Sequence, residues 1–202
     1  MTPDQKAKFA KMIEEVFYSE TPVIKGSKFD IYKCVGSETY RPALTGVYYD
    51  NGTVIASDAH ILAAVKQEYP AEREGLIIDK NGEKIDAKYP NYKGVFSCAE
   101  GWPSYKIDFA KVRNILKRSK AWAKANNKKQ NCHERLIKVG PAFFRLDYFE
   151  ILVSGMEHIE NNVLMIKDKI TAAVCKNDKG ALLLMPFCEP SDEDGVFIEE
   201  LK

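Results

Sequence analysis

The sequence predicts an α+β protein built on antiparallel β-sheet. Three observations favour this class: two stretches with apolar residues at helical spacing, two Asn-Gly pairs between apolar runs, and several strand-like runs joined by short turns. The predicted order is helix, several strands, basic helix, several strands. Strands joined by short turns pair in the antiparallel direction, so this order indicates meandering sheet.

The first predicted helix lies at the N-terminus. Thr2 suits the N-cap, Pro3 suits the first turn, and Gln5 completes a capping box. Thr21-Pro22 ends the helix, because the residue before a proline disfavours the α conformation. One face of this helix is apolar and carries Phe9, Met12, Ile13, Val16 and Phe17.

The first group of predicted strands follows. Residues 28–35 alternate like a strand, and residues 46–57 and 75–86 each contain an Asn-Gly pair, Asn51-Gly52 and Asn81-Gly82. Such pairs between apolar strands favour the primed hairpin turns, in which both central residues take positive φ. The sequence therefore predicts two hairpins here.

A second group of strands is predicted after the basic helix. Four runs have the composition of strands, and residues 176–180 have that of a turn. Residues 100–104, with Gly101 and Pro103, are the candidate linker between the two groups. The four runs are residues 135–140, 142–155, 163–176 and 180–187.

The basic helix is predicted over residues 107–129, with Asp108 as its cap. Its apolar side carries Phe109, Val112, Ile115, Leu116 and Trp122. Another side carries a row of cations, called the basic stripe below: Arg113, Lys117, Lys120, Lys124 and Lys128. Lys106 falls on the same side at helical spacing.

Charge is distributed unevenly along the 202 residues. The formal net charge is +1, yet residues 106–129 hold nine Lys or Arg against one Asp, a local balance of +8. Residues 189–202 hold six acids against one Lys, a local balance of −5. A nearly neutral total therefore conceals a basic segment and an acidic tail.

Composition favours a cytoplasmic protein without a membrane span. Hydrophobic residues make up 45% and charged residues 29% of the chain, and no apolar run approaches the ~20 residues that a span needs. The charged N-terminus lacks the apolar centre of a signal peptide. The cysteines are odd in number and scattered, which favours reduced thiols: Cys34, Cys98, Cys132, Cys175 and Cys188.

The common catalytic signatures are absent. The chain lacks the phosphate-loop, dinucleotide, esterase and zinc-protease patterns, and its three histidines are too scattered for an obvious metal cluster. We therefore expect no enzymatic activity, no cofactor and no metal. An enzyme that pairs Cys98 or Cys132 with His60 stays open as an alternative.

One stretch has a recognisable pattern. "RPALTGVYYDNGTVIASDAHILA", residues 41–63, resembles the Arg-x-x-Leu-x-Gly-Val … Ala-Thr-Asp-Gly-His-Arg-Leu-Ala signature of the bacterial DNA polymerase III β sliding clamp family. The run "ITAAVCKNDKGALLLMPF", residues 170–187, resembles the closing strands of those clamps. The residues that match are Arg41, Leu44, Gly46, Val47, Ala56, Asp58, His60, Leu62, Ala63, Met185 and Pro186.

The chain also departs from the family pattern. Ser57, Ala59, Ile61 and Phe187 stand where the family has Thr, Gly, Arg and Met. The family carries three repeats per chain, whereas this chain has room for about one. The resemblance implies a DNA-clamp-like α+β fold with two helices packed on antiparallel β-sheet. It also implies one clamp-like domain over residues 1–188, followed by an acidic tail over residues 189–202.

The resemblance further implies a non-catalytic replication or repair factor that acts as a processivity clamp. Clamp helices line a ring and contact the backbone of double-stranded DNA without reading its sequence. By this resemblance the basic stripe, Arg113, Lys117, Lys120, Lys124 and Lys128, would bind DNA. The alternative is a solvated helix face, or one that pairs with the acidic tail. A one-repeat chain would need to form a homo-oligomer to encircle DNA.

The family also has a surface pocket for short peptides from DNA polymerases and other DNA enzymes. The resemblance places His60, Leu62, Met185 and Pro186 in such a pocket. On the alternative interpretation Asp58 caps a turn, His60 is structural, and Met185 and Pro186 end a core strand. A clamp-like protein-binding module that does not encircle DNA is the second functional hypothesis. The apolar triplet 196–198 could also dock back near Met185 and Pro186 or on a neighbouring subunit. The alternative is a disordered, solubilising tail.

Overall fold

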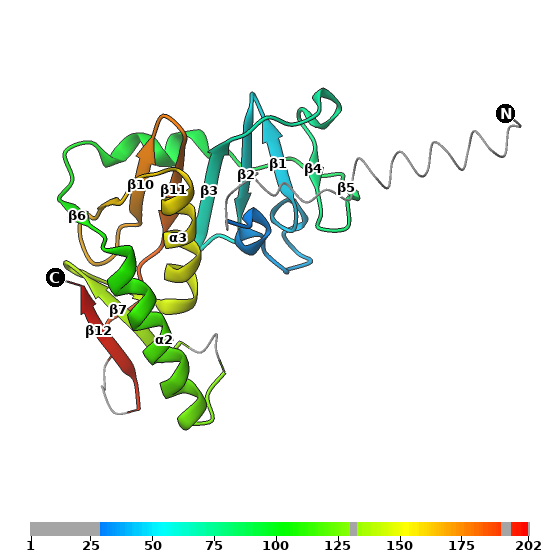
Figure 1. Cartoon of the computed structure of the whole chain (residues 1–202). Coiled ribbons are helices and arrows are strands. Elements are labelled where there is room, and N and C mark those ends of the chain that lie inside the picture. The colour runs from blue at the N-terminus through cyan, green and yellow to red at the C-terminus, as the bar shows by residue number, and fades with distance from the viewer. Residues whose placement is uncertain (1–28, 130–132, 191–194, 202) are drawn as a thin grey trace, which may run out of the picture.

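The computed structural model describes residues 29–129, 133–190 and 195–201. Within them lie two α-helices, α2 (Phe109–Ala125) and α3 (Leu146–His158), and two β-sheets (Figure 1). The helix predicted over residues 2–21 falls outside the described residues. The predicted α+β class, with two helices packed on mainly antiparallel sheet, is confirmed.

The larger sheet has nine strands in the order β5-β4-β1-β2-β3-β11-β10-β9-β6, and all of its pairs are antiparallel. Its middle is the pairing of β3 with β11, which joins the two strand groups that the sequence separates. The strands are β1 (Val47–Asp50), β2 (Thr53–Ser57), β3 (Ile61–Lys66), β4 (Ile77–Ile78), β5 (Lys84–Ile85), β6 (Ser104–Lys106), β9 (Val163–Met165), β10 (Ala173–Asn177) and β11 (Gly180–Leu184).

The smaller sheet has three strands in the order β12-β7-β8. β7 (Arg135–Val139) pairs with β8 (Ala142–Arg145) in the antiparallel direction and with β12 (Phe197–Leu201) in the parallel direction. The end of the acidic segment is therefore a strand of the folded unit, and it lies on β7 instead of near Met185 and Pro186.

The core has two parts, one on each face of the larger sheet. α3 packs on β11 and β3, and also on β7 and β8, so it lies between the two sheets (Figure 1). The opposite face carries a smaller cluster that includes Ile55, Leu62 and Val174, and the 3₁₀ segment η4 (Lys93–Ala99) covers part of it. The other 3₁₀ segments are η1 (Ile31–Cys34), η2 (Pro42–Leu44) and η3 (Ala71–Arg73).

Residues 29–35, the described part of the strand predicted at 28–35, do not form that strand. They contain η1 instead, which begins where the Asp30 carboxylate accepts the Tyr32 N–H at 3.1 Å. Ile31 and Cys34 are its buried residues. Their spacing of three suits the three-residue turn of a 3₁₀ helix, whereas a strand would bury every second residue.

Two later predictions were also wrong in extent. Residues 142–155 were expected as one strand, but β8 ends at Arg145 and α3 begins at Leu146. Residues 163–176 form β9 and β10 with a turn between them, where Asp168 accepts the N–H groups of Ile170 and Thr171. A short apolar run fits a strand or a buried helix equally well, so its composition alone could not separate them.

The first predicted hairpin is confirmed: Asn51 (φ 49°) and Gly52 (φ 70°) join β1 to β2 in left-handed conformations. β4 and β5 also form a hairpin, but there only Gly82 (φ 87°) takes a positive φ. The Asp79 carboxylate accepts the N–H groups of Asn81 and Glu83 in that turn. A wider turn built on Asp79 therefore replaces the expected primed turn.

Candidate nucleic-acid interface and partner pocket

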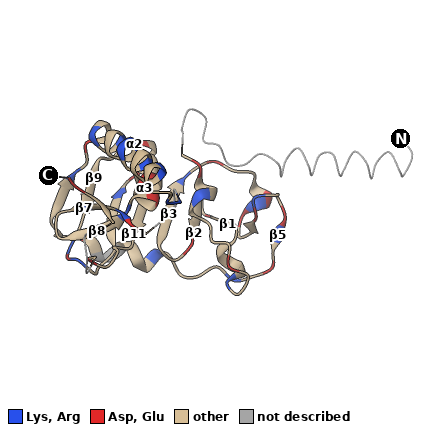
Figure 2. Ribbon diagram, turned by 90° about the horizontal axis from the view of Figure 1, so that it is seen from below, with Lys and Arg blue, Asp and Glu red and all other residues tan. Residues whose placement is uncertain are grey.

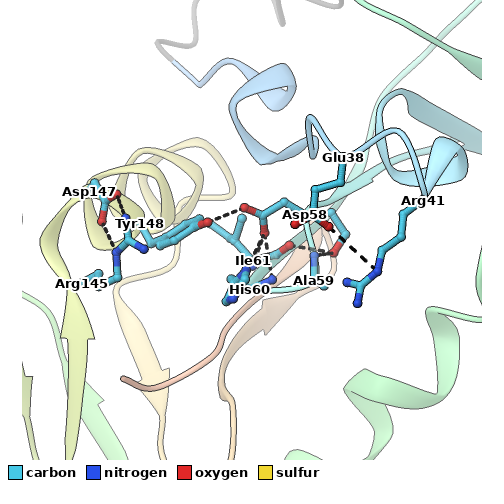
Figure 3. Close-up of polar contacts among 10 residues, drawn as sticks. Glu38, Arg41, Asp58, Ala59, His60, Ile61, Arg145, Asp147 and Tyr148 are labelled. Atoms are coloured by element: carbon cyan, nitrogen blue, oxygen red, sulfur yellow. Dashed lines mark hydrogen bonds and ion pairs between the residues drawn. The ribbon is translucent and has the colours of Figure 1, made fainter. Parts of the chain in front are cut away.

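The Asp58–His60 turn between β2 and β3 is an architectural cap. One oxygen of Asp58 accepts the N–H of His60 at 2.8 Å and the N–H of Ile61 at 2.9 Å (Figure 3). Between them Ala59 has a φ of 77°, in the left-handed region that favours glycine, and the clamp signature has Gly at this position. The capping role that the sequence suggested for Asp58 is confirmed.

Tyr148, in the first turn of α3, ties this cap to the helix. Its hydroxyl donates to the other oxygen of Asp58 at 2.6 Å (Figure 3). Burial, and then this hydrogen bond, raise the pKa of Tyr148 above its usual range, so the donor keeps its proton. The His60 ring stacks on Tyr148 with 5.7 Å between centroids, and the Arg145 guanidinium lies 4.9 Å from the same centroid. Arg145 is held by Asp147 through hydrogen bonds of 3.1 and 2.5 Å.

Three of the four predicted pocket residues meet at one end of the larger sheet. Leu62 of β3 is the register partner of Leu183 on β11, and the Met185 N–H donates to the carbonyl of His60 at 2.8 Å. Leu62 is buried in the smaller cluster, whereas Met185 is 40% exposed and His60 is exposed. The strand pairing therefore brings the Asp-His turn beside the Met-Pro segment.

Pro186 lies in a pocket of about 370 Å³ that the other three residues do not line. Ile170, at its rim, is 75% exposed, although a large apolar side chain usually stays covered. Phe187, which lines the pocket, forms an isolated antiparallel bridge with Phe143 of β8. The residues that line this pocket are Phe143, Lys169, Ile170, Pro186, Phe187, Cys188 and Glu189.

All five residues of the basic stripe are exposed, and Figure 2 shows Lys and Arg along α2. Lys128, however, lies beyond the helix and not on it as predicted, because α2 ends at Ala125 and Asn127 takes a positive φ of 53°. Asp108 caps the helix as predicted, accepting the N–H groups of Ala110 and Lys111. Lys106, however, lies in β6 and not on the helix.

Three of the stripe cations form ion pairs. Arg113 pairs with Glu157 and Lys120 pairs with Glu150 at 2.7 Å, and both acids belong to α3. Lys128 pairs with Glu134 at 2.7 Å. Ion pairs between exposed side chains contribute only about 0–1 kcal/mol each, so these contacts leave the lysines able to change partners.

Lys117 and Lys124 form no ion pair with a described residue. The acidic tail contacts the opposite flank of α2: Arg118 pairs with Glu199 at 2.7 Å, and Trp122 lies 6.0 Å from Phe197 between ring centroids. Pairing between this helix and the tail therefore occurs outside the basic stripe.

Two of the described thiols, those of the buried Cys34 and Cys175, are poorly suited to nucleophilic chemistry, whereas Cys188 is exposed. Burial raises the pKa of Cys34 above its usual range and that of Cys175 to about 12, so both stay protonated near neutral pH. The side chain of Cys98, and Cys132 itself, are outside the described residues. The described residues contain no group of three or more His, Cys, Asp or Glu that could hold a metal ion. They also include no helix long and apolar enough to cross a membrane.

No protein-family model and no curated protein matches the sequence. Solved structures do match. A DNA polymerase III subunit beta from Pseudomonas aeruginosa aligns with a TM-score of 0.55 and 15% identity over 78% of this chain and 62% of its own. The beta subunit from Thermotoga maritima aligns with a TM-score of 0.53 and 14% identity. The beta sliding clamp from C. crescentus aligns with a TM-score of 0.56 and 12% identity. Each of these two alignments covers 89% of this chain and 64% of the other chain.

The chain therefore spans less than two thirds of the clamp structures that it matches. At these identities the likeness concerns the fold. The resemblance seen in residues 41–63 and 170–187 is thus confirmed in three dimensions: the chain has the fold of the bacterial DNA polymerase III β sliding clamps.

Proposed function

We propose that the chain is a non-catalytic, clamp-like factor of DNA replication or repair. It contacts the backbone of double-stranded DNA through α2 and takes partner peptides near Met185 and Pro186. The row of exposed cations along α2, within a clamp fold, carries this proposal. Backbone phosphates attract such a row whatever the base sequence, which suits a protein that moves along DNA.

Charge reversal on α2 tests the DNA contact. Lys117→Glu combined with Lys124→Glu changes two cations that have no described ion-pair partner. Each phosphate contact adds about one unit to the slope of log affinity against log salt, so the double variant should lower that slope by about two. The matched control reverses Lys80 and Lys88, which are exposed near the β4–β5 hairpin. Equal losses in both variants would count against a contact through α2.

The peptide pocket is proposed at the 370 Å³ site beside Pro186, with Met185 and Ile170 as its exposed apolar edge. A structure of the sliding clamp from Bartonella birtlesii is bound to griselimycin, and one of the beta subunit from Borrelia burgdorferi is in complex with a natural product, so clamps of this fold do bind such ligands. Ile170→Asp should abolish binding of an apolar peptide from a partner polymerase, since it adds a charge at the rim. Lys167→Asp is the control, because it changes charge nearby without lining the pocket.

Encirclement of DNA would require more than one copy of this chain, because the chain spans only 62–64% of the clamps that it matches. We propose that copies assemble into a ring. The division into a domain at 1–188 and a tail at 189–202 stays a prediction. β12, which pairs with β7, belongs to the range predicted as the tail.

A clamp-like module that binds partner proteins without encircling DNA is the second candidate. The observation that favours it is the pairing of Arg113, Lys120 and Lys128 with glutamates, which lowers the positive potential of the stripe. Light scattering separates the two functions: a closed oligomer with a concentration-independent mass supports the ring. A monomer of 22.9 kDa at every concentration supports the binding module.

A further inference from the structure

A groove lies beside the C-terminal half of α2. It runs between that half of α2 and the first turns of α3, and β7 contributes Arg135. Its volume, about 880 Å³, falls within the ~300–1,000 Å³ typical of ligand pockets. The lining residues are Lys120, Ala121, Lys124, Asn127, Lys128, Arg135, Asp147 and Glu150.

The groove is positively charged. Four cations and two carboxylates line it, a formal balance of +2. Two further charged residues belong to these ion pairs: Glu134 pairs with Lys128, and Arg145 pairs with Asp147. Their opposite charges leave the formal balance unchanged. Three stripe lysines and a buried arginine are thus gathered in one place, whereas the first half of α2 carries only two stripe cations, Arg113 and Lys117.

Arg135 gives the groove a fixed cation. Its side chain is fully buried, with 1% of the residue exposed, and its Nη2 donates to the Ser119 hydroxyl at 2.7 Å. A guanidinium presents several N–H groups in a planar fork that matches a phosphate. Because packing and Ser119 already fix this side chain, an anion that binds here orders few further rotatable bonds.

Three lysines surround Arg135, two of them in ion pairs. Lys120 and Lys128 are held toward the groove by Glu150 and Glu134, in pairs that are worth only about 0–1 kcal/mol each when exposed. Lys124 lies between them and has no described ion-pair partner. α3 also starts at this groove, and its N-cap residue Arg145 makes no side-chain capping hydrogen bond. The positive end of the α3 dipole therefore adds to the field there.

We propose that this groove binds a single phosphate group through Lys124, Lys128 and Arg135. In the DNA complex it would hold one backbone phosphate at a fixed point of α2, while the rest of the stripe makes diffuse contacts. The phosphate site stands on the groove alone. Its assignment to a DNA phosphate rests on the proposed function.

The test uses inorganic phosphate and a short duplex as separate probes of the full chain. Phosphate should shift the side-chain NMR signals of Arg135 and Lys124 along a saturable curve. Lys124→Gln should weaken phosphate binding about tenfold, the effect of losing one charged hydrogen bond. Lys117→Gln removes the same charge from the same stripe outside the groove, and it should leave the phosphate affinity unchanged.

The same variants are then measured for their affinity for the short DNA duplex. Lys124→Gln should weaken duplex binding about tenfold, and Lys117→Gln clearly less. Ala121→Glu, which places a carboxylate in the groove on an exposed helical position, should act like Lys124→Gln. Circular dichroism of each variant confirms that α2 is intact.

The outcomes separate the two proposals. Non-saturable phosphate shifts, or equal duplex losses in Lys124→Gln and Lys117→Gln, would overturn the groove while leaving DNA contact by α2 in place. Saturable phosphate binding that Lys124→Gln weakens, in a protein that does not bind the duplex, would support a free-anion site and overturn the proposed DNA function.

Discussion

Ala59 is a residue whose conformation conflicts with its side chain. Its φ of 77° suits glycine, which the clamp signature has at this position. We expect Ala59→Gly to raise the free energy of unfolding by about 0.5–1 kcal/mol. The substitution relieves the strain of about 1–2 kcal/mol that a residue with a β-carbon has in the left-handed conformation, but it also increases the conformational entropy of the unfolded chain, which offsets part of the gain. Chemical denaturation measures the change.

The control for this prediction is Ala110→Gly, on an exposed position of α2. There the same substitution should lower the free energy of unfolding by about 1 kcal/mol, since glycine disfavours a helix. Destabilisation by both variants would show that Ala59 is not strained.

Tyr148 anchors the Asp58 cap to α3. Tyr148→Phe removes the 2.6 Å hydrogen bond and leaves a largely buried carboxylate one donor short. The free energy of unfolding should fall by about 1–2 kcal/mol, as measured by denaturation. Tyr105→Phe is the control, because the hydroxyl of Tyr105 makes no hydrogen bond with a described residue. The cap would be shown to be independent of α3 if both variants lost the same stability.

At this scale the sequence predicted the cap but not its anchor. Asp58 could be recognised because Asp followed by two residues and a strand is a common turn pattern. Tyr148 and Arg145 could not be assigned to the site, because residues 142–155 were interpreted as one strand. Arg135 gave no signal either, since burial of an arginine depends on how β7 packs.

Among the elements, α2 was predicted with its cap because its apolar spacing extends over many turns. α3 was missed because "AFFRLDYFEILV" has few polar residues to set a period. The ion pairs from Glu150 and Glu157 to the basic stripe were missed with it. The partial neutralisation of the stripe could therefore not be foreseen.

The packing of α3 on the sheet depends on Gly155. A β-carbon there would lie 2.9 Å from the methyl groups of Leu182 on β11 and 3.2 Å from Phe29. Gly155→Ala should therefore lower the melting temperature, with a loss of about 1–3 kcal/mol from overpacking that exceeds its gain in helix propensity. Ser154→Ala, one position earlier, should have little effect. Equal melting temperatures would contradict this account of the packing.

Asp50 links the β1–β2 hairpin to η4. The Lys93 ammonium, at 2.7 Å, and then the Tyr92 hydroxyl hold the pKa of Asp50 below its ordinary value of 3.8. The folded state therefore favours the carboxylate, and this stabilisation is present above pH 3.8 and disappears as the pH falls through the lowered folded-state pKa.

We expect Asp50→Asn to be less stable than the wild type near neutral pH, with the difference shrinking below about pH 4. Denaturation curves at several pH values measure it. Glu72→Gln, at an exposed acid of η3, is the control and should show no such convergence. A difference that stays constant with pH would contradict the role of Asp50.

For the whole molecule, the sequence predicted antiparallel meanders and, through the family resemblance, the approach of the Asp-His turn to the Met-Pro segment. The β3–β11 pairing produces that approach. The parallel pairing of β12 with β7 could not be predicted, because residues 197–201 are acidic and short. Besides the pairing with β7, the packing of Phe197 on Trp122 and the Arg118–Glu199 pair hold this strand.

The most direct test of the central claim is the affinity of the chain for two duplexes of unrelated sequence, measured by fluorescence anisotropy over a series of salt concentrations. Contact with backbone phosphates predicts equal affinities and a linear fall of log affinity with log salt. No binding at low salt, or a strong preference for one duplex that is insensitive to salt, would contradict a clamp-like contact with the DNA backbone.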